Sequence, residues 1–275
     1  MDELHVRSFY AHPVNYAFGH NSAQREAAVW RWLILFLVLT AVASTAHEPE
    51  AQQPFEHPHA HAALEASFHA GWESRYASEG RDNLAGDSLG TTSIDLGGEH
   101  FSAGVWFGKS PEQKYDELRF TVGLTETFGP LTAFLAYTYV QYQYQYANLD
   151  DHEISLWAEC TELPWDLEVS AYAYYSIMAE GAFIEAALHR DILARDRFSL
   201  RGSLLLGFNQ GYVPDGHAGV NHLAVRLGSE FALTTSFAIT AHLSYSWALD
   251  RDSELSGDAQ LIDFLHVGIG VQWSF

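Results

Sequence analysis

The carboxy-terminal stretch Leu265–Phe275, LHVGIGVQWSF, alternates between apolar residues and small or polar ones. Successive side chains of a β-strand point to opposite faces, so this period of two predicts a strand with one apolar and one polar face. The apolar face ends in the aromatic residues Trp273 and Phe275. Aromatic residues at the end of an apolar strand face suit the girdle where a membrane β-barrel meets the headgroups.

The same alternation recurs upstream as far as Leu64 and predicts about 12 strands. The expected strands span residues 64–77, 89–97, 100–109, 115–128, 130–145, 152–162, 165–178, 182–193, 198–210, 218–233, 236–249 and 262–275. An even number of strands places both ends of a barrel on one side of the membrane. The pattern therefore predicts an all-β fold, an antiparallel transmembrane β-barrel with an up-and-down meander over residues 64–275.

The connections between these segments fall into two classes. Those after even-numbered strands are tight, such as 97–100 and 128–130. Most of the others are longer and acidic, such as 78–88 and 250–261. Short periplasmic turns and longer extracellular loops are typical of outer-membrane barrels, so we expect the acidic segments to be external loops.

Composition agrees with a β-protein and excludes one class of partner. The chain has 275 residues, of which 14% are aromatic, and this bias favours strands. The net charge of −21 argues against a nucleic-acid partner, since phosphate binding requires clustered Lys and Arg. A lone cysteine, Cys160, is expected to serve in packing.

The amino-terminal region indicates export. Residues 25–46, REAAVWRWLILFLVLTAVASTA, combine a basic start, an apolar core too short for a membrane helix and small residues, as in a signal peptide. Residues 1–24 are interpreted as an extension from a start site placed too early. Residues 47–63 form a flexible leader rich in His and Pro, whose histidines at 57, 59 and 61 we interpret as a solvated linker and not a metal site.

A secreted β-sandwich also has alternating strands, so alternation alone does not settle the class. The signal peptide, the two classes of connection, the terminal Phe275 and the aromatic residues near strand ends together favour a membrane barrel. These aromatic residues are Trp72, Trp165, Tyr175, Trp247 and Trp273. We therefore predict a barrel in the outer membrane of a Gram-negative envelope, in contact with lipid and inserted by the barrel-assembly machinery through the strand that ends at Phe275.

Short motifs give the chain a family resemblance. The frame GWESRYASEG places Ser74, Tyr76 and Gly80 as in the Ser-x-Tyr-x-x-x-Gly start of the TorF-family putative porins. Three later segments, GVWFG at 104–108, YDELR at 115–119 and VGIGVQWSF at 267–275, are also similar to that family. The family typically has Arg before the glycine, whereas this chain has Glu79 there and Arg81 after it. The resemblance implies an outer-membrane barrel and no particular substrate.

If the apolar faces meet lipid, the other faces line the lumen. Strand parity assigns to this lining Glu73, Arg75, Asp95, Glu117, Arg119, Glu153, Glu159, Glu168, Glu185, His189, Arg201, Arg226, Glu230, His242 and His266. Carboxylates outnumber arginines in this set, so the sequence favours a porin-like passive channel for small cationic or neutral solutes. The alternatives are a closed structural barrel, in which these charges pair, and a surface-interaction barrel that uses its acidic loops.

An enzyme is not expected. The pair His242-x-Ser244 is similar to the His-x-Ser pairing of outer-membrane phospholipases, but parity points both residues inward and Tyr245 follows where those enzymes have Asn. The segment DRDSELSGD at 250–258 lacks the glycine and glutamate of a calcium-binding loop. We therefore predict no catalytic residues, no metal site and no cofactor.

Overall fold

We describe the barrel from a computed structural model that covers residues 65–144 and 148–275. The predicted extension 1–24, signal peptide 25–46 and leader 47–63 lie outside these residues. The described part of the chain contains no helix long and apolar enough to cross a membrane.

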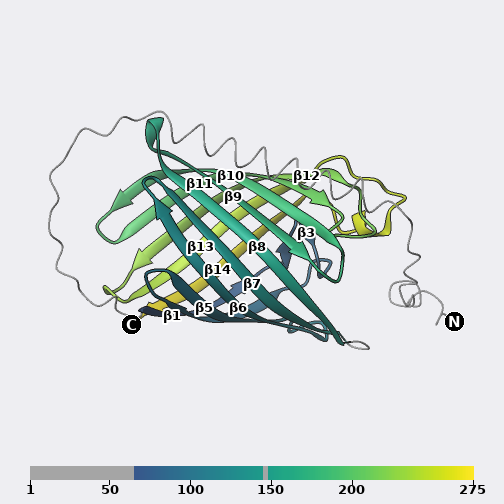
Figure 1. Cartoon of the computed structure of the whole chain (residues 1–275), viewed down its shortest axis with the longest axis horizontal. Coiled ribbons are helices and arrows are strands. Elements are labelled where there is room, and N and C mark those ends of the chain that lie inside the picture. Colours follow the sequence, from purple (N-terminus) through teal and green to yellow (C-terminus); the bar gives the residue numbers. More distant parts are fainter. Residues whose placement is uncertain (1–64, 145–147) are drawn as a thin grey trace. The chain divides into compact units, whose positions relative to one another are not determined.

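Twelve antiparallel strands form one closed barrel in which each strand pairs with its neighbours in the sequence (Figure 1). They are β1 (Glu65–Glu73), β4 (Leu89–Gly97), β5 (Phe101–Lys109), β6 (Tyr115–Phe128), β7 (Leu131–Tyr144), β8 (Asn148–Leu163), β9 (Leu167–Ser176), β10 (Gly181–Arg195), β11 (Phe198–Gln210), β12 (Gly219–Ala232), β13 (Phe237–Ala248) and β14 (Phe264–Ser274). Two further strands, β2 (Ala77–Ser78) and β3 (Arg81–Asp82), pair with each other. The predicted strand count and meander are confirmed.

The first and last strands close the barrel. Strand β1 pairs with β14 from Ser67 opposite Ser274 to Glu73 opposite Gly268. The seam continues to the carboxy terminus, where Ala66 and Phe275 exchange two backbone hydrogen bonds of 3.1 and 2.9 Å. Closure pairs the edges of the sheet, and a β-structure in lipid needs this because the bilayer core offers no water to unpaired N–H and C=O groups.

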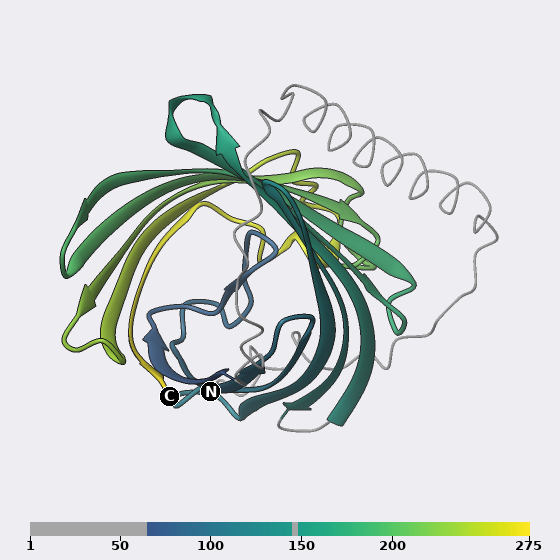
Figure 2. The ribbon, with the colours of Figure 1, turned by 60° about the vertical axis from the view of Figure 1, so that its left-hand side comes forward.

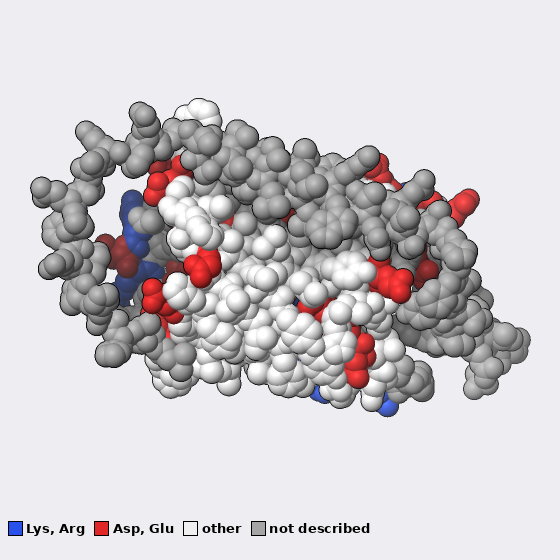
Figure 3. All heavy atoms as spheres, in the orientation of Figure 1, with Lys and Arg blue, Asp and Glu red and all other residues white. Residues whose placement is uncertain are grey.

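The outward face is apolar. On β14, Leu265, Ile269 and Trp273 are each more than half exposed, and the same holds for Leu124 on β6 and Leu135 on β7. On the face in Figure 3, uncharged side chains cover the middle of the barrel, and most acidic side chains lie toward its two ends. Such a continuous exposed apolar surface is stable only against hydrocarbon, so the barrel lies in a bilayer.

Tight turns connect the strands at the end of the barrel that carries Glu65 and Phe275. The turn between β8 and β9 is a short 3-10 helix, Pro164–Asp166, and it presents Trp165, which is 79% exposed, to the surroundings. Most connections at the other end are longer, and those after β7 and β9 are as short as the tight turns. We expected these connections to be external loops. The segment between β1 and β4 does not project outward.

Candidate functional site: the barrel lumen

The segment 74–88, between β1 and β4, enters the barrel interior (Figure 2). Its strands β2 and β3 form a hairpin whose two turn residues, Glu79 and Gly80, have φ of 50° and 68°. Glycine is required at the second position, because a Cβ on Gly80 would lie 2.3 Å from Cγ of His222. The hairpin therefore approaches the wall of the barrel closely at this point.

Arg81 anchors the hairpin and is only 2% exposed. Its guanidinium forms an ion pair of 3.0 Å with Oδ1 of Asp258 and donates a hydrogen bond of 2.9 Å to Oδ1 of Asn221. Its Nε donates to the carbonyl of Gly257 at 3.0 Å. These contacts join the hairpin to β12 and to the connection between β13 and β14, so a buried charge is fully paired, as its desolvation requires.

Two tyrosines and a second ion pair hold the rest of the segment. The Tyr76 hydroxyl donates to Glu117 at 2.7 Å, and the Tyr174 hydroxyl on β9 donates to Glu79 at 2.5 Å. Arg75 pairs with Asp82 within the segment.

The expectation that 78–88 is an external loop is therefore wrong, and Arg75 does not extend strand β1, which ends at Glu73. The chain leaves the wall there because its polar side chains find partners inside the barrel.

A first cluster of wall charges lies beside this segment on β6 and β8. Arg119 pairs with Glu117 and lies 3.9 Å from Glu153. Glu117 also accepts a hydrogen bond from the Tyr115 hydroxyl, and Glu153 accepts one of 2.6 Å from the Tyr212 hydroxyl. Both carboxylates are almost fully buried.

A second cluster lies toward the end of the barrel that has the tight turns. Arg201 on β11 pairs with Glu168, and its guanidinium lies 3.7 Å from Glu159 and 3.5 Å from Asp191. His189 on β10 is held by hydrogen bonds of 2.9 Å to Ser170 and 2.8 Å to Ser203. The predicted lining charges Glu159, Glu168 and Arg201, from three strands, therefore form one network with Asp191, which we did not predict.

The remaining predicted lining residues are less densely paired. His222 lies 3.4 Å from Glu185, and Glu73 lies near His242 and His266 in a group of its own.

Asp95 and Glu230 lie on strand faces opposite to exposed apolar neighbours, and Arg226 borders a cavity. His242 pairs with Glu73 at 3.1 Å, and Ser244 borders the same cavity as Arg226.

Two cavities lie along the inner wall. One, of about 250 Å³, is bordered both by the hairpin and by wall residues that include Arg119, Arg226 and His266. The other, of about 600 Å³, lies at the mouth near the carboxy terminus, among Glu65, Asp95 and Ser274. The interior is thus polar and hollowed, and the hairpin borders its inner cavity.

Several residues of the site were missed by reasoning from the sequence, chiefly Tyr76, Arg81, Asp82, Tyr174 and Asp258. The tyrosines resemble the aromatic residues of a membrane girdle, and the other three lie in segments that were assigned to external loops. One feature of the sequence could have indicated an inward segment. Arg81 is a basic residue in a segment, 78–88, whose other charged residues are acidic, and it directly follows the motif that resembles the TorF-family start.

We expect the ion pair between Arg81 and Asp258, which holds the hairpin to the wall, to break only in acid. Burial raises the pKa of the Asp258 carboxyl, but hydrogen bonds from the Asp252 N–H and from His217 outweigh burial and bring the pKa below its ordinary value of 3.8. A lowered pKa in the folded state gives stability that is present above the ordinary value and is lost as pH falls through the folded value. We expect the hairpin to stay anchored from pH 5 to 8 and to loosen only below about pH 4. Conductance recorded against pH in planar bilayers, with Asp258→Asn as the control that removes the titration, checks this.

Comparison with known proteins supports the architecture. No family model matches the chain, and no curated protein matches it. Among solved structures, the fold is similar to the KdgM porin, with a TM-score of 0.51 at 8% identity over 77% of this chain and 99% of that one. An outer membrane channel from Pseudomonas putida F1 has a TM-score of 0.48 at 9% identity over 82% of this chain and 100% of that one, and the NanC porin 0.47 at 12% over 77% and 99%.

Identities this low show the fold alone, and membership of the TorF family is not confirmed. The closed meander of twelve strands, the apolar outer face and the polar interior nevertheless agree with one another. The chain is an outer-membrane β-barrel with a porin-like fold.

Proposed function

We propose that this barrel is a narrow passive channel for small cationic or neutral solutes, with the hairpin of segment 74–88 as its constriction. The observation that carries the proposal is the inward hairpin itself, which borders a polar cavity together with wall residues from several strands. A barrel built only for structure could fill its interior with side chains, as small barrels do.

The preference for cations is proposed from the charges that remain without a cationic partner. Buried Arg81 and the partly buried Arg119 and Arg201 are each paired with carboxylates. In contrast, Glu230 and Asp95 lie on inward strand faces with no ion pair among the described residues. Unpaired carboxylates along a pathway lower the energy of a cation there and raise that of an anion.

The second candidate is a barrel that the hairpin occludes, and the burial of Arg81 and Asp82 favours it. It could then serve a structural or surface-binding role.

We also propose that the signal peptide at 25–46 directs export and that the barrel-assembly machinery recognises the strand that ends at Phe275. The aromatic carboxy terminus supports this proposal.

Single-channel recording decides between the two candidates. The purified full-length protein in a planar bilayer should give discrete steps with cation selectivity, and Glu230→Gln should lower the cation-to-anion permeability ratio measured from reversal potentials. The matched control is Glu126→Gln, which removes the same charge from the outer surface. Silence from a folded, heat-modifiable barrel would favour occlusion, and an equal change in both variants would rule out a selectivity role for Glu230.

A further inference from the structure

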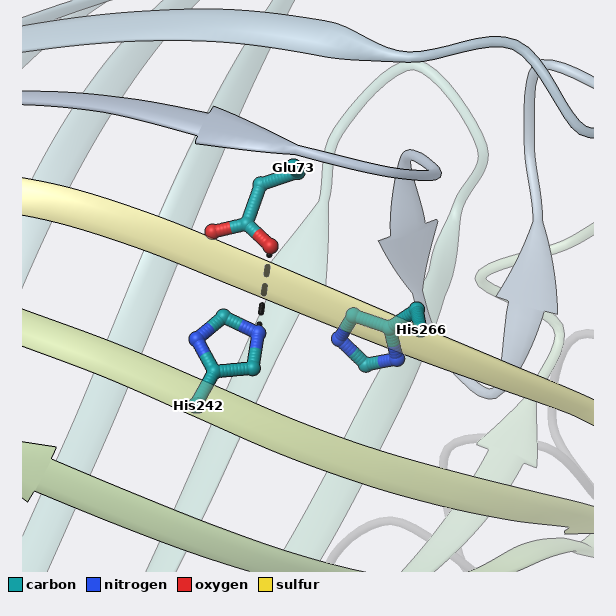
Figure 4. Close-up of side chains that lie close together, drawn as sticks. All are labelled: Glu73, His242 and His266. Carbon is teal, nitrogen blue, oxygen red and sulfur yellow. Dashed lines mark ion pairs between the residues drawn. The ribbon is translucent and has the colours of Figure 1, made fainter.

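Three potential metal ligands converge on the inner wall at the seam of the barrel (Figure 4). They are Glu73 at the end of β1, His242 on β13 and His266 on β14, and one ligand atom of each lies within 4.8 Å of the others. Nε2 of His242 lies 3.1 Å from Oε2 of Glu73. The rings of His242 and His266 meet edge to face with centroids 5.1 Å apart.

Strand register explains why these residues meet. Gly268 on β14 lies directly opposite Glu73 on one side and directly opposite His242 on the other. With no side chain between them, the carboxylate and the imidazole reach each other above the backbone of β14. A Cβ at Gly268 would lie 2.4 Å both from Oε2 of Glu73 and from Cε1 of His242. His266 is two residues from Gly268, so it lies on the same inward face.

The atoms of this group lack other partners. Oε2 of Glu73 and Nε2 of His242 are buried and have only their ion pair with each other, and Nδ1 of His266 is buried without a hydrogen bond to the described residues. A buried polar atom without a partner costs free energy, and the great majority of such atoms in folded proteins are satisfied. An unpartnered imidazole nitrogen of His266 beside an ion pair that makes no other hydrogen bond indicates that a further group binds here.

We propose that Glu73, His242 and His266 bind a divalent transition-metal ion, with Zn²⁺ as the best fit. Two imidazoles and a carboxylate are a donor set that zinc accepts, whereas Ca²⁺ and Mg²⁺ prefer oxygen ligands alone. Bonds of about 2.0 Å in a tetrahedron place two ligands about 3.3 Å apart, close to the observed spacing of Glu73 and His242. His266 borders the inner cavity, so a fourth position is open to solvent or solute in the lumen.

The test is Zn²⁺ titration of the full-length barrel in detergent by isothermal calorimetry, with the visible absorption of bound Co²⁺ as a report on coordination. His57, His59 and His61 are replaced by Ala in every sample so that the leader does not bind the ion. We expect one Zn²⁺ per barrel. His266→Gln and Glu73→Gln should each weaken binding at least about 10-fold, since loss of even an outer partner of a metal ligand costs about 10- to 100-fold.

Gly268→Ala is the sharpest variant, because it keeps all three ligands and fills the space where they meet. It should weaken binding as much as the loss of a ligand. His189→Gln is the matched control, since His189 also faces the lumen but both its ring nitrogens are already hydrogen-bonded. Heat-modifiable migration on gels verifies that each variant is folded. The proposal is overturned if the folded barrel binds no Zn²⁺, or if binding persists unchanged in His266→Gln and Glu73→Gln.

Discussion

Replacing Arg81 by Ala should detach the hairpin from the lumen wall and enlarge the conductance of the barrel. Arg81 is the partner of the buried Asp258 carboxylate and of Asn221, and His217 is the other side chain that pairs with this carboxylate. Removing one member of a buried ion pair leaves the other charge uncompensated and costs about 3–5 kcal/mol. We expect a loss of this size in the free energy of unfolding, measured by denaturant titration in detergent, together with larger single-channel steps.

The control for Arg81→Ala is Lys109→Ala. Lys109 pairs with Asp116 at 2.7 Å, but its side chain is 60% exposed, and exposed pairs contribute less than about 1 kcal/mol. Its replacement should change neither stability nor conductance appreciably. If Arg81→Ala destabilises the barrel and leaves the steps unchanged, the hairpin is an anchor for folding and does not form the constriction.

Replacing Leu204 by Arg should destabilise the barrel in lipid by about 2–4 kcal/mol, the cost of a basic residue at the bilayer midplane. Leu204 lies near the middle of β11, between Leu188 of β10 and Val225 of β12, and all three side chains are exposed on the outer face. The cost arises because the guanidinium must either enter hydrocarbon or distort the bilayer to reach water. Reversible folding into vesicles of defined lipid measures it.

A matched substitution outside the bilayer isolates this effect. Ser253→Arg adds the same side chain to an exposed position between β13 and β14, where water remains available. It should fold with nearly unchanged stability. Equal stability of Leu204→Arg and the parent would mean that this outer face does not contact lipid, which contradicts the assignment of a membrane barrel.

The prediction of the wall succeeded because its signal is local. On β6 and β11 the predicted and observed bounds coincide, since the period of two persists over the whole strand and stops at turn residues. The outward direction of Leu124 and Ile269 follows from the same alternation, because lipid accepts only the apolar face. The sequence by itself thus determined the fold class, the twelve strands and the outward direction of apolar side chains such as Leu124 and Ile269.

The interior was decided only by tertiary structure. Arg81 and Asp258 are 177 positions apart, and nothing local to either residue marks them as partners. Glu73, His242 and His266 meet only because closure of the barrel sets β1 and β13 on either side of β14 with Gly268 between them. Alternation fixes which face a residue occupies but not its height against the other strands, because height depends on the register of each pairing and on how the barrel closes. The register therefore decides which inward charges meet. It brings together the Arg81–Asp258 ion pair, the two ion-pair clusters and the candidate metal site.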